Sequence, residues 1–278
     1  MSDSGIVCPV CFRRCRLAEG AAGFCRARKN QGGESVSINY GKVTSMALDP
    51  VEKKPLARFY PGRYILSVGS FGCNLDCPFC QNHEISRAGE DTVGWRYVSP
   101  EELTEAALGL RERGNIGAAF TYNEPMVGFE YVRDAARAVR AAGMKTAVVT
   151  NGTAEPWVLR EILPYADAFN IDLKGFTAEW YEKLGGDFAT VLSFIAEAAK
   201  TSHVELTTLI IPGGNDSEDD MRRLAQWVAS VDRNIPLHVT RFFPRWRMNG
   251  AEPTDVGTLY RLADVAREKL GTVLVGNV

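Results

Sequence analysis

The sequence predicts an α/β protein, a partial (β/α)6 TIM-like barrel preceded by a cysteine-rich segment. Two observations support this: strand-like runs alternate with helical stretches over residues 61–278, and all seven cysteines lie within the first 80 residues. Such alternation is typical of parallel βαβ units, whose functional groups lie at the carboxyl ends of the strands. A complete eightfold barrel needs about 250 residues, so six units predict an open barrel. A doubly wound sheet is the alternative.

Six strands and the helices between them are predicted from apolar periodicity. The strands are expected at 63–70, 115–123, 145–152, 168–174, 203–212 and 235–244, with a further short strand in the final "TVLVGNV". Helices are expected at 99–114, 126–143, 154–166, 217–231 and 254–271, and helical periodicity also runs through "TAEWYEKLGG" and "FATVLSFIAEAAKTS". Ser99 is the predicted N-cap of the first helix, Pro100 its first residue and Gly114 its stop.

Residues 1–60 do not follow this repeat and are predicted to form a separate metal-stapled segment, with the barrel in 61–278. Three prolines in 48–62 suggest an extended connector. A net charge of −2, with 45% hydrophobic and 24% charged residues, indicates a globular protein and gives no reason to expect nucleic acid as a partner. We see no signal peptide and no apolar run near the ~20 residues of a membrane span, so a cytoplasmic protein without a membrane partner is expected.

Three cysteines, Cys73, Cys77 and Cys80, follow the first predicted strand with C-x3-C-x2-C spacing. This places them at the functional end of the barrel, and soft thiolates select zinc or iron–sulfur clusters. One interpretation is a structural zinc site that His83 completes. The other is a [4Fe–4S] cluster with three protein ligands, which leaves one iron open for a substrate or cofactor.

The other four cysteines, Cys8, Cys11, Cys15 and Cys25, supply a closed set of soft ligands. A closed site indicates stability or electron transfer rather than substrate activation. Structural zinc and a second iron–sulfur cluster that relays electrons are both consistent with the spacing. Nearby arginines could offset thiolate charge or bind an acidic electron donor, although solvated arginines are commoner.

The loop Cys73-Asn-Leu-Asp-Cys77-Pro-Phe-Cys80 resembles the CxxxCxΦC signature of radical S-adenosylmethionine (radical SAM) enzymes, with Phe79 as the aromatic residue. Further stretches, among them "YGKVTSMALDPVEKKPLARFYPG", "FTYNEP", "NIDLKG" and "GNV", resemble the AmmeMemoRadiSam-system enzymes. These are relatives of the pyruvate formate-lyase activating enzymes. The resemblance covers essentially the whole chain and implies a radical SAM barrel with oxidoreductase or activating-enzyme-like chemistry.

In mechanism, the resemblance implies a [4Fe–4S] cluster on Cys73, Cys77 and Cys80 whose open iron binds S-adenosylmethionine (AdoMet). It also implies reductive cleavage of AdoMet to a 5′-deoxyadenosyl radical that abstracts hydrogen from an unidentified small molecule or protein residue. A low-potential donor of the ferredoxin or flavodoxin type would supply the electron. An activase for a glycyl radical enzyme is one alternative, and a non-catalytic zinc-stabilised scaffold is another.

Polar residues at the ends of the second and third strands are further candidates for AdoMet binding. Asn123 and Glu124 match the position where the superfamily has a "GGE"-type motif for the methionine amino group, although the glycines are absent. A carboxylate suits that group through a charge-assisted hydrogen bond, but Asn-Glu-Pro could simply cap a helix. Thr150 and Asn151 follow the third strand, where either an AdoMet contact or an Asn-Gly turn fits.

Two later strands add three more candidates. Asp172 and Lys174 alternate onto one side of the fourth strand, where they suit ribose hydroxyls and an anion or form a simple ion pair. His238 lies in "HVTRFFP", which resembles a stretch near AdoMet in activating enzymes, and a buried structural histidine fits equally.

Overall fold

The computed structural model describes residues 5–278 and contains a central sheet of eight strands in the order β14-β13-β12-β11-β10-β9-β7-β6. All neighbours pair in parallel except β6 and β7, which are antiparallel. The parallel strands follow chain order, whereas a doubly wound sheet reverses its order at a switch point. The predicted partial barrel is therefore confirmed. Its strands are β6 (Ser45–Pro50), β7 (Tyr64–Gly69), β9 (Asn115–Phe120), β10 (Lys145–Thr150), β11 (Ala168–Asp172), β12 (His203–Ile210), β13 (Leu237–Arg241) and β14 (Val273–Gly276).

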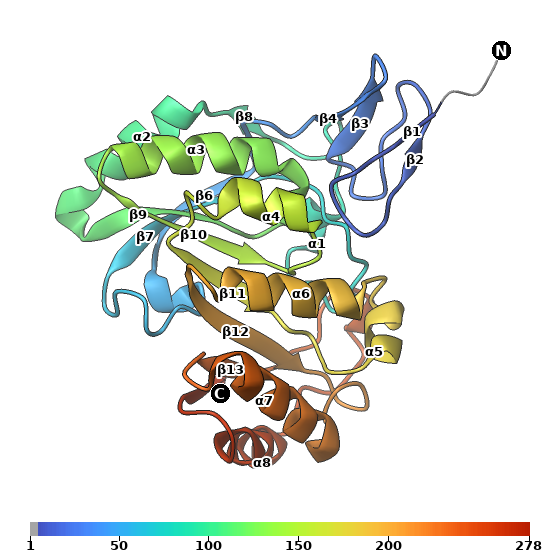
Figure 1. The fold of residues 1–278 in the computed structure, drawn as a ribbon, viewed down its shortest axis with the longest axis vertical. Coiled ribbons are helices and arrows are strands. Elements are labelled where there is room, and N and C mark those ends of the chain that lie inside the picture. The colour runs from blue at the N-terminus through green and yellow to red at the C-terminus, as the bar shows by residue number, and fades with distance from the viewer. Residues whose placement is uncertain (1–4) are drawn as a thin grey trace.

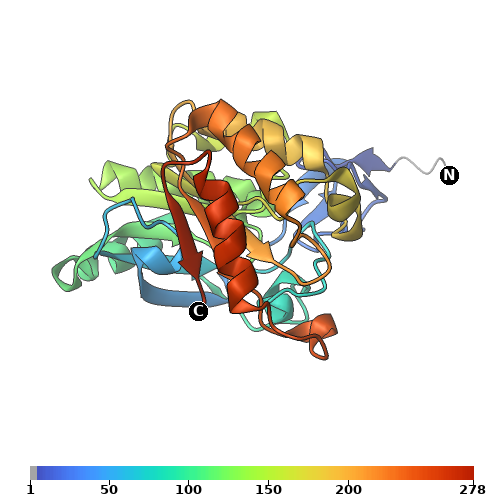
Figure 2. The same cartoon turned by 90° about the horizontal axis from the view of Figure 1, so that it is seen from below.

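Helices cover the outer face of this curved sheet (Figures 1 and 2). They are α2 (Pro100–Gly109), α3 (Phe129–Ala141), α4 (Pro156–Ile162), α5 (Ala178–Lys183), α6 (Phe188–Ala198), α7 (Glu218–Asp232) and α8 (Val256–Arg267). Ser99 caps α2 as predicted, because its hydroxyl accepts from Glu102 N and the Glu102 carboxylate accepts from Ser99 N. Strand residues such as Phe120, Ile171 and Leu206 pack outward into the main apolar core. The alternate residues therefore face the barrel interior.

The amino-terminal end of the barrel is closed by the chain that follows β6. Val51, Leu56 and Phe59 are buried against Ile65 and three strand alanines, Ala119, Ala147 and Ala168. The sequence analysis did not predict β6 and expected 48–62 to be a simple connector. Instead, β6 extends the sheet and the following residues form the floor of the barrel. The division of the chain at residue 60 remains a prediction, and β6 joins the last part of residues 1–60 to the sheet.

Glu205 of β12 holds this floor in place. Its side chain is fully buried and accepts hydrogen bonds from His203 Nε2 (2.9 Å) and His238 Nε2 (2.7 Å). The backbone N–H groups of Ala57 and Arg58 donate to the same carboxylate at 3.0 and 2.7 Å. Burial by itself raises the pKa of Glu205, but these hydrogen bonds lower it to about 2.

We predict that Glu205→Gln lowers the free energy of unfolding at pH 7 by about 3 kcal/mol. A depressed carboxylate pKa contributes stability that is present above the unfolded pKa and lost as pH falls through the folded pKa. The difference from wild type should therefore shrink between about pH 4.5 and pH 2. Denaturant unfolding at a series of pH values measures this, with exposed Glu112→Gln as the control. Equal unfolding free energies at pH 7 would contradict the assigned role.

The segment before β6 packs against the opposite, carboxyl-terminal end of the barrel (Figure 1). It contains β1 (Ile6–Val7), β2 (Arg16–Leu17), β3 (Arg28–Gln31), β4 (Glu34–Ser37) and β5 (Lys42–Val43), which pairs with β8 (Arg96–Tyr97). Glu155 N donates to Val10 O at 3.0 Å, and Trp157 Nε1 of α4 donates to Pro9 O at 3.0 Å. The cysteine-rich segment thus lies beside the loops that follow the strands.

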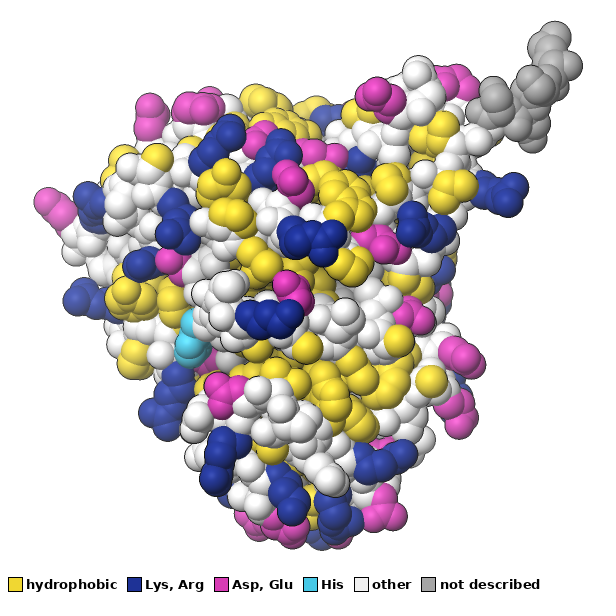
Figure 3. Space-filling model, viewed as in Figure 1, with side chains coloured by type: hydrophobic (Ala, Val, Ile, Leu, Met, Phe, Trp, Pro, Cys, Tyr) yellow, Lys and Arg dark blue, Asp and Glu magenta, His cyan; other side chains and the backbone are white. Residues whose placement is uncertain are grey.

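The surface seen in Figure 3 carries basic and acidic side chains interspersed over most of its area. Neither sign forms a broad continuous field on that face. None of the helices in residues 5–278 combines the length and apolar composition that crossing a bilayer requires.

Candidate functional site

The loop with Cys73, Cys77 and Cys80 connects the carboxyl end of β7 to the short helix α1 (His83–Ser86). All three are free thiols. Cys77 is buried, Cys73 and Cys80 are partly exposed, and Cys73 and Cys77 belong to one apolar cluster. Phe79 is buried there and stacks on Trp180, with ring centroids 6.4 Å apart. The remaining buried apolar neighbours are Leu75, Leu184, Ile211 and Phe242. These side chains largely shield Cys77, which is 8% exposed, from water.

The surroundings make the thiolate forms of Cys73 and Cys77 unfavourable without a bound cation. Burial, and then the charge of Glu124, raise the pKa of Cys73 well above its ordinary value. Burial raises the pKa of Cys77 to about 11, although Lys174 opposes the shift. A cationic iron centre would compensate for this cost, because metal binding deprotonates thiols. The donor set therefore fits a cluster held by three thiolates.

The arrangement of the side chains also bears on the zinc alternative. Within residues 5–278, no three Cys, His, Asp or Glu side chains are arranged to hold a single metal ion. One zinc draws each of its sulfur ligands to about 2.3 Å, whereas a cluster puts each thiolate on a different iron and so spaces the thiolates more widely. His83 Nδ1 lies 3.3 Å from Cys80 O, and its ring stacks on Trp246 with centroids 5.4 Å apart. The structure therefore gives His83 partners other than an ion shared with the cysteines.

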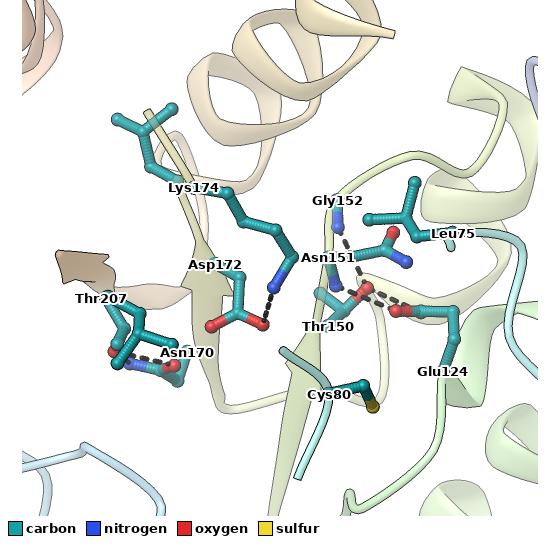
Figure 4. A network of polar contacts seen from close by, with 12 residues as sticks. Leu75, Cys80, Glu124, Thr150, Asn151, Gly152, Asn170, Asp172, Lys174 and Thr207 are labelled. Carbon is teal, nitrogen blue, oxygen red and sulfur yellow. Dashed lines mark hydrogen bonds and ion pairs between the residues drawn. The ribbon is translucent and has the colours of Figure 1, made fainter. Parts of the chain in front are cut away.

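Glu124 joins the ends of β9 and β10 (Figure 4). Its side chain is buried, and Oε1 accepts from Thr150 Oγ1 at 2.6 Å and from Met126 N at 3.0 Å. Oε2 accepts from Asn151 N at 2.7 Å. Burial raises the pKa of Glu124 to about 7, although the three donors oppose that shift. Three of the predicted residues, Glu124, Thr150 and Asn151, thus form one polar network.

Asn123 contacts the cysteine loop itself. Its Nδ2 donates to Phe71 O at 3.1 Å and Gly72 O at 3.2 Å, and its Oδ1 accepts from Ser70 N at 3.0 Å. The side chain therefore clamps the backbone where the loop leaves β7. Its amide is occupied by this clamp, so the structure gives Asn123 a part in positioning the cysteines.

A second polar chain links the end of β10 to the cysteine loop. Asn151 Nδ2 donates to Asn74 Oδ1 at 2.9 Å and lies 3.8 Å from Cys73 Sγ. Asn74 Nδ2 in turn donates to Thr153 Oγ1 at 2.8 Å. The sequence analysis missed Asn74 and Thr153, because uncharged loop residues carry no distinguishing signal in a single sequence.

Asp172 and Lys174 face the Glu124 network from β11 and the loop that follows it (Figure 4). The Lys174 ammonium donates to Asp172 Oδ2 at 2.8 Å, so the predicted pair forms an ion pair. Trp180 Nε1 fixes the Lys174 backbone by donating to its carbonyl at 2.7 Å. Burial lowers the pKa of Lys174, but Asp172 and Cys77 together raise it above the ordinary value. A fixed positive charge therefore lies near Cys77.

His238 lies apart from these groups. It is the second residue of β13, and its Nε2 contacts Glu205 in the floor of the barrel. The interpretation of His238 as a buried, hydrogen-bonded histidine describes this position, whereas the predicted cofactor contact would need it near the strand ends. The partner on β12 is distant in sequence, so no local pattern indicated it.

One buried polar cluster inside the barrel was not predicted. The Lys54 ammonium lies 2.8 Å from Asp49 Oδ2, and Tyr122 OH donates to the same oxygen at 2.7 Å. Tyr122 has a positive φ of 74°, which few residues other than glycine adopt. Asp49 and Lys54 belong to the stretch expected to be a connector, and for that reason they were not considered as interior residues.

Gly72 is the position where the cysteine loop meets the N-terminal segment. Its φ is +93°, and a Cβ there would lie 2.5 Å from Cys25 O and 2.8 Å from Ala27 Cβ. We predict that Gly72→Ala lowers the free energy of unfolding by at least about 2 kcal/mol and reduces the iron retained per chain. Thermal unfolding and iron analysis measure both effects. Gly94→Ala, at a glycine with open space around it, is the control and should change neither. A Gly72→Ala protein as stable as wild type would contradict this close approach.

Comparison with known proteins agrees with this geometry. The sequence matches the radical SAM superfamily over residues 67–228. The protein MJ0808 of Methanocaldococcus jannaschii is 38% identical over 286 residues, covering 100% of this chain and 83% of that protein. The pyruvate formate-lyase 1-activating enzyme of Escherichia coli is 29% identical over 220 residues, covering 71% of this chain and 86% of that enzyme. SuiB of Streptococcus suis, bound to its precursor peptide SuiA, shares the fold with a TM-score of 0.59 at 13% identity, over 74% of this chain and 46% of SuiB.

The sequence match and the fold therefore agree on the family. The finer resemblance to the AmmeMemoRadiSam-system enzymes stays a prediction. The family implies a [4Fe–4S] cluster and AdoMet, and the cysteine loop at the end of β7 has the donor set for such a cluster. The chain belongs to the radical SAM superfamily.

Proposed function

We propose that this protein is an enzyme that cleaves AdoMet reductively and uses the resulting radical to abstract hydrogen from a substrate. The observation that carries the proposal is the set of three free thiols, Cys73, Cys77 and Cys80, in the loop at the carboxyl end of β7, beside the Glu124 network. When bound there, a [4Fe–4S] cluster would supply the electron that breaks the sulfonium C5′–S bond of AdoMet, giving methionine and a 5′-deoxyadenosyl radical. The other residues of the site are proposed to bind and orient AdoMet and to shield the cluster from water.

Glu124 is the proposed partner of the AdoMet amino group. Its pKa of about 7 leaves the carboxylate readily ionised when a positive group arrives, and three fixed donors hold its orientation. Thr150 and Asn151 take part by holding that carboxylate, and Asn151 also approaches Cys73. Preorganised polar groups of this kind bind without a reorganisation cost.

Asp172 and Lys174 are proposed to serve the nucleoside side of AdoMet. The Asp172 side chain is one-third exposed, at 33%, so an oxygen of its carboxylate can accept from ribose hydroxyls. Lys174 fixes that carboxylate and lies near Cys77. Phe79, stacked on Trp180, keeps the neighbourhood of the cluster apolar. Asn123 positions the loop, and we propose no direct cofactor contact for His238.

The substrate is proposed to be a small molecule or a residue of a protein or peptide. The similarity to a pyruvate formate-lyase activating enzyme and the fold shared with SuiB, seen with a peptide, favour a polypeptide. An activase for a glycyl radical enzyme is the narrower form of this idea. A ferredoxin- or flavodoxin-type donor is the proposed electron source.

Anaerobic reconstitution with iron and sulfide tests the proposal. We expect a brown protein that forms 5′-deoxyadenosine and methionine from AdoMet when a low-potential reductant is added. Chromatography quantifies both products, and heat-denatured protein is the control. A colourless protein that binds zinc and leaves AdoMet intact would favour the non-catalytic scaffold and overturn the proposal.

A further inference from the structure

The four N-terminal cysteines surround one small cavity, which lies next to the loop that carries Cys73, Cys77 and Cys80. It is lined by Cys8, Cys11, Cys15 and Cys25, together with Arg13, Arg28 and Asn74. We propose that these four cysteines hold a second [4Fe–4S] cluster, which passes electrons to the cluster on Cys73, Cys77 and Cys80. The relay rests on the proposed function, whereas the second cluster is independent of it.

The local fold directs the four thiols to this cavity. Strands β1 and β2 pair antiparallel, and Cys8 N donates to Cys15 O at 2.9 Å just beyond that pairing. Cys11 lies in the turn between them and forms a bridge with Ala154, which anchors the turn to the barrel. Cys25 enters from the following loop and is 6% exposed. All four are free thiols, so no disulfide competes for them.

The arrangement favours a cluster over one zinc ion. Within the part of the chain that the structure describes, no three such ligands are placed to hold a single ion, and this applies to both sets of cysteines. For Cys73, Cys77 and Cys80 the superfamily implies a cluster. A closed zinc site gathers four sulfurs at about 2.3 Å from one point. Four thiols around one shared cavity suit a cube of four irons, with one iron for each thiolate.

The charge around the cavity also suits a cluster, which carries net negative charge with four thiolates. Two arginines, Arg13 and Arg28, belong to the lining, and no Asp or Glu does. Arg28 is 3% exposed and is fixed by Glu130 at 2.7 Å. Arg13 lies over the Phe24 ring, 3.6 Å from its centroid. Ser35 Oγ donates to Cys8 Sγ at 3.1 Å, a hydrogen bond of the kind that tunes cluster potentials.

Asn74 lies where the two sets of cysteines approach each other. Asn74 lines the cavity and directly follows Cys73 in the chain. Asn74 and Cys11 line the same cavity. Asn74 also binds Asn151, which lies 3.8 Å from Cys73 Sγ. Asn74 therefore lies beside both sets of cysteines: it lines the cavity with Cys11 and is linked through Asn151 to the neighbourhood of Cys73.

In the proposed relay, one electron moves at a time and no covalent bond changes. A reduced flavodoxin- or ferredoxin-type donor gives an electron to the N-terminal cluster, which goes from the 2+ to the 1+ state. That electron then reduces the cluster on Cys73, Cys77 and Cys80 from 2+ to 1+, and the N-terminal cluster returns to 2+. The donor is the species that is oxidised overall.

The second cluster is tested without using activity. The triple variant Cys73→Ala/Cys77→Ala/Cys80→Ala, reconstituted anaerobically, should retain about four iron and four sulfide per chain, against about eight of each in wild type. Dithionite should then give the electron paramagnetic resonance signal of a reduced cluster. One zinc per chain with no iron would overturn the second cluster. This result stays informative even if wild type fails to cleave AdoMet.

The relay is tested with Cys11→Ala and, as a second variant, Cys15→Ala. Each should keep about four iron per chain and cleave AdoMet within about twofold of wild type with a titanium(III) reductant. With reduced flavodoxin the rate should fall at least about tenfold. Exposed Glu34→Gln, in the same segment, is the control and should match wild type with both reductants. Equal rates with both reductants, or loss with both while the first cluster is intact, would overturn the relay.

Discussion

Cys77→Ala is expected to abolish the formation of 5′-deoxyadenosine, lowering its rate by at least about a thousandfold. Loss of residues that merely orient a metal ligand costs 10- to 100-fold, and Cys77 would be a direct ligand. Cys77 is 8% exposed, and the other two cysteines of the loop, Cys73 and Cys80, are themselves proposed ligands and so cannot replace it. The assay quantifies 5′-deoxyadenosine after anaerobic reconstitution, and iron content should fall in parallel.

Cys77→Ser separates the loss of a ligand from the loss of volume. It nearly keeps the volume of the side chain, but a hydroxyl is a poor ligand for iron–sulfur clusters. We expect the same loss of activity, with a melting temperature close to that of the unreconstituted wild-type protein. Retention of more than a tenth of the wild-type rate in either variant would contradict a cluster held by this cysteine.

Glu124→Gln is expected to weaken AdoMet binding by about 10- to 100-fold, because hydrogen bonds to charged groups contribute about 1.5–3 kcal/mol. Glutamine keeps the shape of the side chain but carries no charge. The carboxylate now accepts hydrogen bonds from Thr150 Oγ1, Met126 N and Asn151 N. In the glutamine variant, the NH2 group would face one of these donors and that hydrogen bond would be lost. Equilibrium dialysis of the reconstituted protein against labelled AdoMet measures the dissociation constant.

A matched control comes from a glutamate outside the site. Glu112→Gln changes an exposed side chain near the end of the first barrel helix and should leave the AdoMet dissociation constant within twofold of wild type. Iron content distinguishes weaker AdoMet binding from cluster loss, and we expect it to be unchanged in Glu124→Gln. An unaltered dissociation constant in that variant would contradict the proposed contact with the AdoMet amino group.

The sequence was most informative where structure is local. Ser99 and Pro100 mark the start of α2 because capping needs only neighbouring residues. The parallel strands could be predicted because each is a short apolar run between turn signals. Strand β6 escaped detection, because its pairing with β7 is a long-range property and the prolines around it suggested a connector.

The candidate site divides in the same way. Glu124 and Asp172 lie at strand ends, and the topology alone brings such residues to one edge of a barrel. His238 also lies on a strand, but alternation says only that a side chain points inward, not at which level its partner lies. Its bond to Glu205 and the polar chain through Asn74 depend on how separate loops and strands meet in space. A single sequence contains no information about such long-range contacts.

The floor of the barrel determines how molecules reach the reaction centre. Val51, Leu56 and Phe59 seal the amino-terminal end, and Glu205 ties that plug to the strands. We expect no passage for water or dioxygen from below, so a primary carbon radical would be protected on that side by the fold alone. Substrate entry and product departure would then use the opposite mouth. Whether solvent quenches the radical would then depend on what occupies that mouth during turnover. The bound substrate itself would block the mouth and exclude solvent.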